Sequence, residues 1–389
     1  MSSPHLVHVV THAMSADHLL RGQLRWMRER GWRVTLVTSP NERLSAISER
    51  EGVEVVEVPI PREIEPARDL RALGALVLAL RRLQPDVVNA STPKAGLLGM
   101  AAARVLHVPA RVYVMRGLRL ETSAGIKRAI LSATERVATA CAHSVVPVSA
   151  SLGRKAVAMG LAPASKVATA GGGSSNGVRT ELFATPDPEE VSSLRARLGL
   201  VEGTPVVGFV GRFTRDKGVA ELVEAFDVVR ATRPRARLLL VGALEPGDPV
   251  SPSVLSRIDS DPGILKPGFL ADPSAAYALM TVLAFPSHRE GFPNVPLEAG
   301  AAGLPVVAAQ ATGSVDAVLH GITGTLVGVG DVGALADALA RYLDHPALAA
   351  SHGQAGARRA QTDFAPERIW EALDALYRDL LPLRSRPPR

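Results

Sequence analysis

Cysteine is almost absent from this sequence, since Cys141 is the only one among 389 residues. A single cysteine excludes a disulfide within the chain, and it fits a protein of the reducing cytoplasm. Cys141 lies in the apolar run ATACAHSVV, which indicates a packed interior position rather than a reactive thiol. Aromatic residues are also scarce, at 4%, but 47% of the residues are hydrophobic. That hydrophobic share is typical of a globular protein and excludes a disordered chain.

The sequence also lacks a long uninterrupted apolar segment. Its longest apolar run, from Ala72 to Leu80, is bounded by Arg71 and Arg81. That run is far shorter than the ~20 residues that a helix needs to span a bilayer. The N-terminal MSSPHLVHVV has no charged region followed by an apolar one, so we expect no signal peptide. The sequence therefore predicts no membrane-spanning helix.

Side chains at metal-ligand spacing are missing as well. The histidines are scattered along the chain without the spacing of a ligand set. Asp259-Ser260-Asp261 does form an Asp-x-Asp pair of the kind that can hold a divalent cation. Because Pro262-Gly263 follow it directly, a solvated turn at a helix end is the simpler interpretation. We therefore predict no metal site.

Positive charge is present in modest excess, with a formal net charge of +6 that comes mostly from arginine. Such an excess can indicate nucleic acid, anionic lipid or a phosphorylated substrate as a partner, and it can equally reflect arginine-rich codon usage. The basic residues are spread through the chain instead of forming one tract. We predict no nucleic-acid partner.

Strand and helix patterns alternate along a chain long enough for two domains. This alternation predicts an α/β protein, with two doubly wound Rossmann-like domains whose parallel sheets carry helices on both faces. Ligands of such sheets bind beyond the carboxyl ends of the strands, so both domains should face a cleft. We place the first domain at residues 1–184, the second at 185–364, and a C-terminal helix at 365–389.

The glycine-rich segment GGGSSNGV lies near the junction of the two halves, after the segment from Lys166 to Ala170 that closes the first half. Glycine and serine at this density predict a turn or hinge. Gly171-x-Gly173 is not a dinucleotide-binding fingerprint, because Asn176 stands where the third glycine is required and no long helix follows.

The stretch from Phe285 to Ala309 reads as a strand end, a polar turn, a short helix and another apolar strand. In the turn, Asn294 is in position to cap the helix, and Pro296 lies in its first turn, where its missing N–H costs little. The first turn of a helix can hold a phosphate group. Glu290 before the turn and Glu298 within the helix could then bind hydroxyls on either side of that phosphate. A nucleotide sugar presents this arrangement of groups.

A second stretch, Phe209 to Gly218, reads as a strand that ends at Gly211 and Arg212 and is followed by Lys217 before the next helix. Arginine offers a planar fork of donors and lysine a compact charge, a combination suited to a diphosphate. Positive charge at a helix start opposes the helix dipole, so a bound anion explains these residues better than an ordinary basic turn does.

Together the two stretches resemble the Glu-x7-Glu and GR-x4-KG signatures of retaining GT-B glycosyltransferases of family 4. The resemblance implies the GT-B fold, with the C-terminal helix crossing back to an N-terminal acceptor-binding domain and the second domain binding the nucleotide sugar. It also implies that Glu290 contacts the donor sugar, that Glu298 contacts the ribose, and that Arg212 and Lys217 neutralise the donor diphosphate.

The same resemblance extends to single positions. Gly268-Phe269-Leu270 looks like the family segment whose backbone reads the base, which implies uridine. Where many family members have histidine, this chain has Arg116, which either contacts an acceptor phosphate or pairs with a carboxylate. We assign Ser15 and Arg116 to acceptor binding and Glu290, Arg212 and Lys217 to catalysis. The residues assigned to donor binding are Gly211, Arg212, Lys217, Phe269, Leu270, Glu290, Gly291, Phe292, Pro293, Asn294 and Glu298.

The implied reaction is sugar transfer with retention at the anomeric carbon, with a UDP-sugar as co-substrate and no cofactor or metal. No residue stands out as a nucleophile or as an in-line base. The resemblance therefore implies electrostatic catalysis, in which the cations stabilise charge on the leaving diphosphate, Glu290 positions the sugar, and the acceptor hydroxyl loses its proton to the departing phosphate.

The acceptor is less well defined by the sequence. Cationic residues between Ala110 and Ala140 alternate with apolar ones, which fits either a surface resting on anionic lipid or a core helix with solvated arginines. STPKAG, from Ser91 to Gly96, resembles members that build capsule, exopolysaccharide or O-antigen repeats. These features favour a polyprenyl-diphosphate-linked or other glycan acceptor at the inner face of the membrane. A soluble small-molecule acceptor and a non-catalytic sugar-nucleotide-binding subunit are the alternatives.

Overall fold

The computed structural model describes residues 3–61, 63, 65–245 and 247–381. The chain forms two compact units. Unit 1 contains the residues up to Gly177 together with those from Pro366 onward, and unit 2 contains Val178–Ala365. The chain thus leaves unit 1 just after the glycine-rich segment and returns to it with the C-terminal helix, whereas the boundaries proposed from the sequence were 184 and 364.

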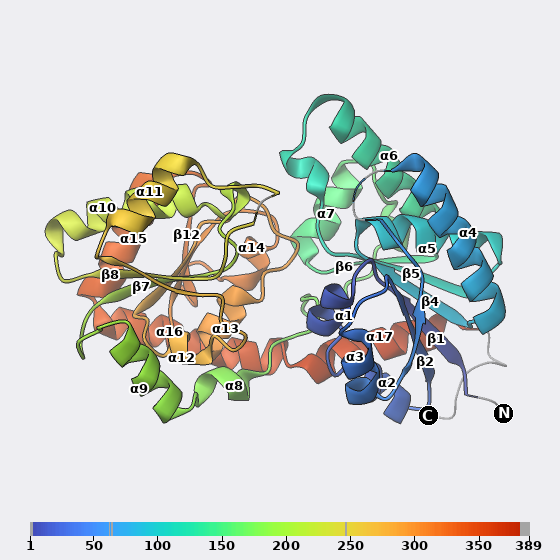
Figure 1. The fold of residues 1–389 in the computed structure, drawn as a ribbon, viewed down its shortest axis with the longest axis horizontal. Helices are drawn as coiled ribbons and strands as arrows, with labels where there is room; N and C mark the ends of the chain where they lie inside the picture. The colour runs from blue at the N-terminus through green and yellow to red at the C-terminus, as the bar shows by residue number, and fades with distance from the viewer. Residues whose placement is uncertain (1–2, 62, 64, 246, 382–389) are drawn as a thin grey trace. The chain divides into compact units, whose positions relative to one another are not determined.

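Unit 1 is built on a parallel sheet of six strands in the order β3-β2-β1-β4-β5-β6, with helices on both of its faces (Figure 1). Because the chain adds β2 and β3 on one side of β1 and then β4 to β6 on the other, the topological switch point lies between β1 and β4. The strands are β1 (His5–Val9), β2 (Arg33–Thr38), β3 (Glu54–Glu57), β4 (Val87–Ser91), β5 (Ala110–Met115) and β6 (Ser144–Pro147).

The helices of unit 1 connect these strands. They are α1 (Ala13–Leu19), α2 (Gln23–Glu29), α3 (Leu44–Glu51), α4 (Pro66–Leu83), α5 (Pro93–Val105), α6 (Gly125–Cys141), α7 (Ala150–Ala158) and α17 (Pro366–Leu380), with 3-10 turns η1 (Arg119–Thr122) and η2 (Ala164–Lys166). Helix α5 packs closely on the sheet, since a Cβ at Gly99 would lie 3.0 Å from the Cβ of Ala90 on β4. Helix α17 belongs to the opposite face, where the side chain of Asn89 donates a hydrogen bond to the hydroxyl of Tyr377.

Unit 2 repeats the design with a parallel sheet in the order β12-β11-β10-β7-β8-β9. Its switch point lies between β7 and β10, again because the chain builds first to one side of its initial strand and then to the other. The strands are β7 (Val206–Val210), β8 (Arg237–Val241), β9 (Ile264–Gly268), β10 (Val282–Phe285), β11 (Val306–Ala309) and β12 (Gly324–Val327). The helices are α8 (Thr180–Ala184), α9 (Pro188–Arg197), α10 (Val219–Thr232), α11 (Pro252–Ser260), α12 (Ser274–Tyr277), α13 (Val295–Ala301), α14 (Ser314–Ala317), α15 (Val332–Asp344) and α16 (Pro346–Asp363), with the 3-10 turn η3 (Arg215–Lys217).

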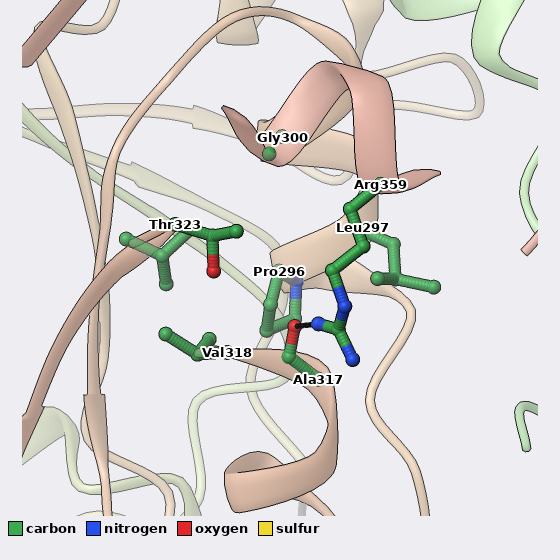
Figure 2. A pocket seen from close by; sticks show the side chains of 9 residues that line it. Pro296, Leu297, Gly300, Ala317, Val318, Thr323 and Arg359 are labelled. Carbon is green, nitrogen blue, oxygen red and sulfur yellow. Dashed lines mark hydrogen bonds between the residues drawn. The ribbon is translucent and has the colours of Figure 1, made fainter. Parts of the chain in front are cut away.

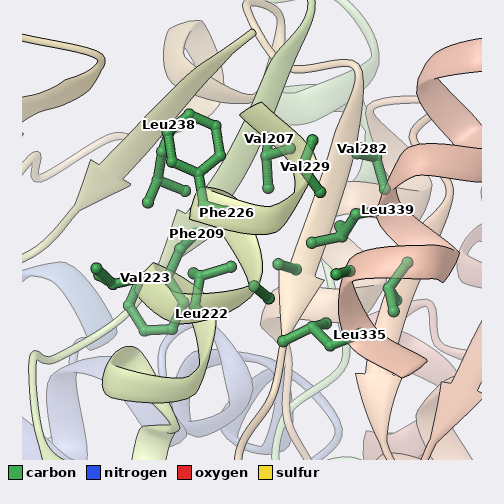
Figure 3. Packing of buried hydrophobic residues seen from close by; sticks show 14 of the residues in the cluster. Val207, Phe209, Leu222, Val223, Phe226, Val229, Leu238, Val282, Leu335 and Leu339 are labelled. Carbon is green, nitrogen blue, oxygen red and sulfur yellow. The ribbon is translucent and has the colours of Figure 1, made fainter. Parts of the chain in front are cut away.

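Both faces of the second sheet are buried. On one face, Val207 and Phe209 of β7 pack with Phe226 of α10 and Leu339 of α15, as Figure 3 shows. On the other face, Val206 packs in a second cluster that includes Tyr277 and residues of α13. Burial of alternate strand residues on opposite faces explains why these strands read as continuous apolar runs in the sequence.

The two six-stranded parallel sheets confirm the predicted α/β class with two doubly wound Rossmann-like domains. One local prediction is wrong. Cys141 is partly exposed at the end of α6 instead of lying in the packed interior.

Candidate functional site

The candidate site lies at the switch point of unit 2, on the loops that follow the adjacent parallel strands β7 and β10. Open α/β sheets bind their ligands beyond the carboxyl ends of the strands at such a point. The loop after β7 carries Gly211 to Gly218, and the loop after β10 carries Pro286 to Asn294. The two motifs found in the sequence therefore lie on neighbouring loops.

Lys217 and Glu290 form the central contact between these loops. The Nζ of Lys217 donates to Oε1 of Glu290 at 2.5 Å, and the two side chains are only 17% and 12% exposed. The hydroxyl of Ser287 donates to the same oxygen at 2.7 Å. A carboxylate that receives both an ammonium and a hydroxyl donor is held in one orientation, and burial strengthens the pair.

The close approach of the two loops depends on glycine. Gly218 has φ +70°, and a Cβ there would lie 2.2 Å from the carbonyl oxygen of Pro286. Gly313, after β11, has φ +79°, and its Cβ would lie 2.3 Å from the carbonyl oxygen of Gly291. Only a residue without a side chain allows these contacts, so the loops after β7, β10 and β11 converge through glycines.

A second ion pair lies directly beside the first. Asp216 precedes Lys217, Arg289 precedes Glu290, and Nη2 of Arg289 lies 2.8 Å from Oδ2 of Asp216. The backbone N–H of His288 also donates to the carbonyl of Asp216 at 2.8 Å. Burial favours the neutral acid, but the hydrogen bond from Thr214 and the nearby charges of Lys217 and Arg289 outweigh it and lower the pKa of Asp216.

Sequence analysis did not identify Asp216, Arg289 or Ser287 as part of the site. A signal was present, because the dipeptides Asp216-Lys217 and Arg289-Glu290 have complementary charges in opposite order. That complementarity became meaningful only once the two loops were known to be adjacent.

Arg212 has a different environment from Lys217. It leaves the end of β7 with its side chain 55% exposed, and Nη1 lies 3.1 Å from Oε2 of Glu245. Glu245 follows β8, so Arg212 contacts the next loop of the sheet rather than Glu290. An exposed pair of this kind is weak, and the guanidinium can exchange its partner at little cost.

Glu298 lies within α13 and accepts a hydrogen bond of 2.7 Å from the hydroxyl of Tyr277. Burial raises the pKa of Glu298, and the bond from Tyr277 only partly opposes that effect. Asn294 occupies the N-cap position, but its side chain makes no capping hydrogen bond. The ring of Phe292 is buried against Phe364, with 5.1 Å between ring centroids, so only its backbone is placed to meet a ligand.

A small cavity lies behind α13, lined by Pro296, Leu297 and Gly300 on one side and by Val318 and Thr323 on the other (Figure 2). Arg359 closes it by donating to the carbonyls of Ala317 at 2.5 Å and Asp316 at 2.6 Å. The cavity holds about one water molecule. A cavity of that size is too small for a nucleotide sugar.

Phe269 and Leu270 follow β9, the edge strand of the sheet. Phe269 is 71% exposed, which is unusual for a large aromatic side chain and leaves its ring accessible. Gly268 before it has φ +85° and accepts a hydrogen bond through its carbonyl from the N–H of Gly242. Strand β8 lies between β7 and β9, so Phe269 and Leu270 are farther from the switch point than Lys217 is. Both segments follow the carboxyl ends of their strands.

The two candidate acceptor residues lie in unit 1. Ser15 is in the first turn of α1, after β1, and Arg116 follows β5 directly. The only hydrogen bond of the Arg116 side chain within the described residues runs from Nη1 to the carbonyl of Ser175, at 3.4 Å, and its Nε is buried without a partner. Burial lowers the pKa of Arg116 to about 10. Burial, together with the charge of Arg116, lowers the pKa of His8 to about 3.

Within residues 3–61, 63, 65–245 and 247–381, no helix has the length and apolar character needed to cross a membrane. In the same part of the chain, no three side chains of His, Cys, Asp or Glu are grouped so that they could hold a metal ion.

Comparison with solved structures defines the class of the fold. HepE (Alr3699) of Anabaena, solved in complex with UDP, matches with a TM-score of 0.78 at 22% identity, covering 96% of this chain and 99% of that chain. Sucrose-phosphate synthase of Thermosynechococcus elongatus matches with a TM-score of 0.79 at 21% identity, covering 97% and 99%. The fold is that of the GT-B glycosyltransferases.

Sequence comparison then gives the family. Residues 16–173 match the model of a glycosyl transferase 4-like domain, and residues 204–345 match the model of glycosyl transferases group 1. The capsular polysaccharide biosynthesis glycosyltransferase CapM of Staphylococcus aureus is 34% identical over 381 residues, 98% of each chain. The chain therefore belongs to the family 4 glycosyltransferases, and it is a glycosyltransferase.

Proposed function

We propose that this glycosyltransferase moves a sugar from a UDP-sugar to a hydroxyl of a polyprenyl-diphosphate-linked or other glycan acceptor, with retention at the anomeric carbon. The name of the CapM relative supports a role in capsule-type polysaccharide synthesis. The UDP bound to HepE supports a uridine nucleotide. The proposal includes contact with an anionic membrane at its cytoplasmic face, because a polyprenyl-linked acceptor is anchored in a bilayer.

The observation that carries the proposal is the contact of Lys217 with Glu290 at the switch point of unit 2. Each side chain satisfies the other, and each can exchange its partner for a ligand group. A diphosphate is a better partner for Lys217 than the Glu290 carboxylate because it carries more negative charge and can receive Arg212 as well. Glu290, released from Lys217, can then accept hydrogen bonds from sugar hydroxyls while Ser287 holds it in place.

The proposed chemistry is electrostatic. The bond between the anomeric carbon and the diphosphate oxygen breaks, and the acceptor oxygen bonds to the same face of that carbon. The proton of the acceptor hydroxyl passes to the departing diphosphate. Lys217 and Arg212 stabilise the negative charge that develops on the leaving group, and Glu290 positions the sugar ring. In this proposal the two cations, and no divalent metal, neutralise the diphosphate.

The remaining assignments follow the same arrangement. Glu298 binds the ribose, and the backbone of Phe269 and Leu270 meets the base. The backbone from Gly291 to Asn294 lies between the two glutamates and surrounds the diphosphate. On unit 1, Ser15 and Arg116 bind the acceptor.

Two alternatives are kept. Transfer to a soluble small molecule would use the same donor site, and it differs only in the acceptor. A non-catalytic sugar-nucleotide-binding subunit would bind the donor without turning it over. The complete set of Arg212, Lys217, Glu290 and Glu298 favours an enzyme over such a subunit.

The test starts with a panel of nucleotide sugars screened by thermal shift, since a ligand that binds the folded state raises its apparent stability. We expect UDP-sugars to raise the transition temperature more than GDP- or ADP-sugars. Turnover of the selected donor is then measured with a short-chain polyprenyl-diphosphate sugar acceptor, and NMR of the product gives the anomeric configuration.

Lys217→Ala and Glu290→Ala should each reduce turnover at least about a hundredfold, by the size of effect seen when a charge-stabilising group is removed. Lys266→Ala, which removes an exposed lysine of the same unit, is the control and should have no effect. Unchanged turnover in Lys217→Ala or Glu290→Ala, or an inverted product, would overturn the assignment. Donor binding without turnover on any acceptor would favour the non-catalytic subunit.

A further inference from the structure

Arg359 of α16 is hydrogen-bonded to the loop that follows β11. Its side chain is only 16% exposed, and its guanidinium donates to the carbonyls of Ala317 at 2.5 Å and Asp316 at 2.6 Å. Figure 2 shows the side chain reaching from its helix to the carbonyl of Ala317. Both carbonyls belong to α14, the single helical turn that begins directly after Gly313. Both terminal nitrogens of Arg359 therefore bind the loop after β11.

The same guanidinium is connected to the loop that follows β10 through two aromatic rings. Its Cζ lies 4.9 Å from the centroid of the Phe364 ring, an arrangement in which the cation is attracted to the ring face. Phe364 is 1% exposed, and its ring centroid is 5.1 Å from that of Phe292 in the loop. Tilted pairs of buried rings contribute more than their buried area alone. A chain of three side chains thus connects α16 to the loop that carries Glu290.

These two connections lie on either side of a close contact between the two loops. A Cβ on Gly313 would lie 2.3 Å from the carbonyl oxygen of Gly291 and 3.1 Å from the backbone nitrogen of Phe292. Phe292 follows Gly291 directly, and α14 follows Gly313 directly. Arg359 therefore holds both loops within one helical turn of their mutual contact, and its loss would allow them to separate.

Arg359 projects from a closely packed pair of helices, α16 and α13. A Cβ on Gly356, one turn before Arg359, would lie 3.1 Å from the Cα of Gly300 in α13. A Cβ on Gly353 would lie 1.8 Å from the carbonyl oxygen of Gly303, just after α13. Because the two backbones are in direct contact, α16 cannot shift without displacing α13 as well. The position of Arg359 is therefore fixed relative to the candidate site.

The charge of Arg359 is not explained by a strong ion pair. Its Nε lies 3.7 Å from Oδ2 of Asp363, whose side chain is 51% exposed, and pairs of this kind contribute little. Burial lowers the pKa of Arg359, and the charges of Asp363 and Asp316 only partly oppose that effect. The hydrogen bonds and the ring contact thus mainly offset the desolvation of the guanidinium and add little net stability. What they fix is the position of the two loops.

We infer that Arg359 and Phe364 are positioning residues that hold loop 291–294 in the conformation that binds the donor. The inference rests on the proposed function for the identity of that donor, a UDP-sugar whose diphosphate the backbone of this loop surrounds. Both side chains act only through the loop, since Arg359 lies beside the small cavity behind α13 and Phe364 is buried against Phe292. Their removal should therefore weaken donor binding more than it slows the transfer step.

Arg359→Met tests the hydrogen bonds, because methionine keeps a long side chain without donors or charge. We expect KM for the UDP-sugar to rise about tenfold, with less than about a twofold change in kcat and a nearly unchanged unfolding temperature. Arg359→Lys, which keeps the charge and one donor group, should recover part of the donor affinity. The matched control is Arg358→Met, at the exposed arginine next to it on the same helix, which should leave KM and kcat unchanged.

Phe364→Leu tests the ring contact, and it should also raise KM for the donor. Its matched control is Phe226→Leu in α10, where another fully buried ring has an arginine Cζ, that of Arg230, 5.5 Å from its centroid. Both variants should lower the unfolding temperature, but only Phe364→Leu should weaken donor binding. Equal weakening in the two would trace the effect to lost stability and would overturn the inference.

Hydrogen exchange without nucleotide separates this inference from the proposed function. In Arg359→Met, peptides covering residues 290–295 and 312–318 should exchange about tenfold faster than in Arg358→Met. Unchanged exchange, or faster exchange with an unchanged KM for the donor, would contradict the positioning role. Faster exchange, together with no turnover of any UDP-sugar by the unmodified protein, would overturn the proposed function and leave the effect of Arg359 on the loops standing.

Discussion

Asp216 and Arg289 form an ion pair, with Oδ2 and Nη2 2.8 Å apart, one residue before each member of the Lys217–Glu290 pair. The two loops of the candidate site are thus joined by two adjacent ion pairs with opposite polarity. Neither Asp216 nor Arg289 is assigned a contact with donor or acceptor. Their structural effect is to fix the backbone on which Lys217 and Glu290 stand.

Asp216→Asn tests this positioning role. The neutral amide cannot hold Arg289 by charge, so we expect kcat to fall about tenfold, equivalent to about 1.4 kcal/mol, with a smaller change in KM for the donor. Steady-state kinetics with the selected UDP-sugar would measure both parameters. Asp216→Glu, which keeps the charge, should recover part of kcat.

The matched control is Asp259→Asn, which removes an exposed carboxylate paired with Lys266 in the same unit. It should leave both parameters unchanged. If Asp216→Asn behaves like this control, the second ion pair has no part in positioning the site.

Gly218→Ala tests the contact between the two loops. The new Cβ would meet the carbonyl of Pro286 at 2.2 Å and would also have to accept φ +70°. We expect a loss of about 3 kcal/mol in the free energy of unfolding, together with loss of donor binding, because the loops must separate. Urea denaturation measures the first effect and thermal shift with UDP the second.

Gly199→Ala separates the effect of the steric contact with Pro286 from the effect of the positive φ angle. Gly199 has φ +62°, and its Cβ would meet nothing within 4 Å. This variant should lose only about 1 kcal/mol, the cost of a left-handed conformation in a residue with a side chain. Equal losses in the two variants would show that the Pro286 contact adds no constraint.

Glu135→Gln should remove a pH dependence of stability. Burial is the main reason that the pKa of Glu135 rises from 4.5 to about 7, and the hydrogen bond from Tyr113 opposes it. Between these two values the folded state holds a proton that the unfolded state has lost. The free energy of unfolding therefore falls as pH rises through this window, by about 3 kcal/mol in total.

Glutamine keeps an acceptor for the hydroxyl of Tyr113 but has no proton to lose. We expect Glu135→Gln to be more stable than the unmodified protein at about pH 8 and of similar stability at about pH 4. Chemical denaturation across this range measures the slope. An unchanged slope in the variant would show that another group titrates instead.

Arg116→Met distinguishes a ligand-binding arginine from a structural one. Within the described residues its side chain makes a single hydrogen bond, of 3.4 Å, to the protein. Removing a largely buried cation without a carboxylate partner should leave the melting temperature unchanged or raise it. Turnover with a polyprenyl-diphosphate acceptor should fall, mainly through KM for the acceptor.

Arg111→Met is the control for Arg116. Arg111 is also buried, but its guanidinium donates to the carbonyls of Cys141 at 2.7 Å and Val108 at 2.8 Å. Its removal should lower the melting temperature, since both carbonyls lose their partner. A comparable drop in Arg116→Met, with unchanged acceptor kinetics, would make Arg116 a structural residue.

The sequence predicted a large part of the fold because the necessary signals are local. Apolar strands such as Val206–Val210 and Val306–Ala309 are buried on both faces, so they appear as continuous apolar runs between polar helices. The motifs around Lys217 and Glu290 were found for the same reason, since each lies within one short strand-loop-helix segment. The sequence could not reveal the pairing of Asp216 with Arg289, which are 73 residues apart.

Helix α6 shows most clearly what could not be predicted from the sequence. The sequence left two interpretations open, a lipid-facing surface or a core helix with solvated arginines. In the structure α6 packs against α5 with its arginines in solvent, as the second interpretation has it, but Ile126 and Ile130 are exposed as well. Helical periodicity alone favours burial of the isoleucines. In the structure the helix instead turns Glu135 toward the sheet, where it accepts a hydrogen bond from the hydroxyl of Tyr113, 22 residues away.

The sequence by itself determined the order of strands and helices and the positions of the charged loops, because these depend on residues close together in the chain. Only the tertiary structure decided which loops meet at the switch point of unit 2 and which face of α6 remains in solvent. Those outcomes depend on hydrogen bonds and ion pairs between distant residues, whose free energy is gained only when the sheet brings their partners together.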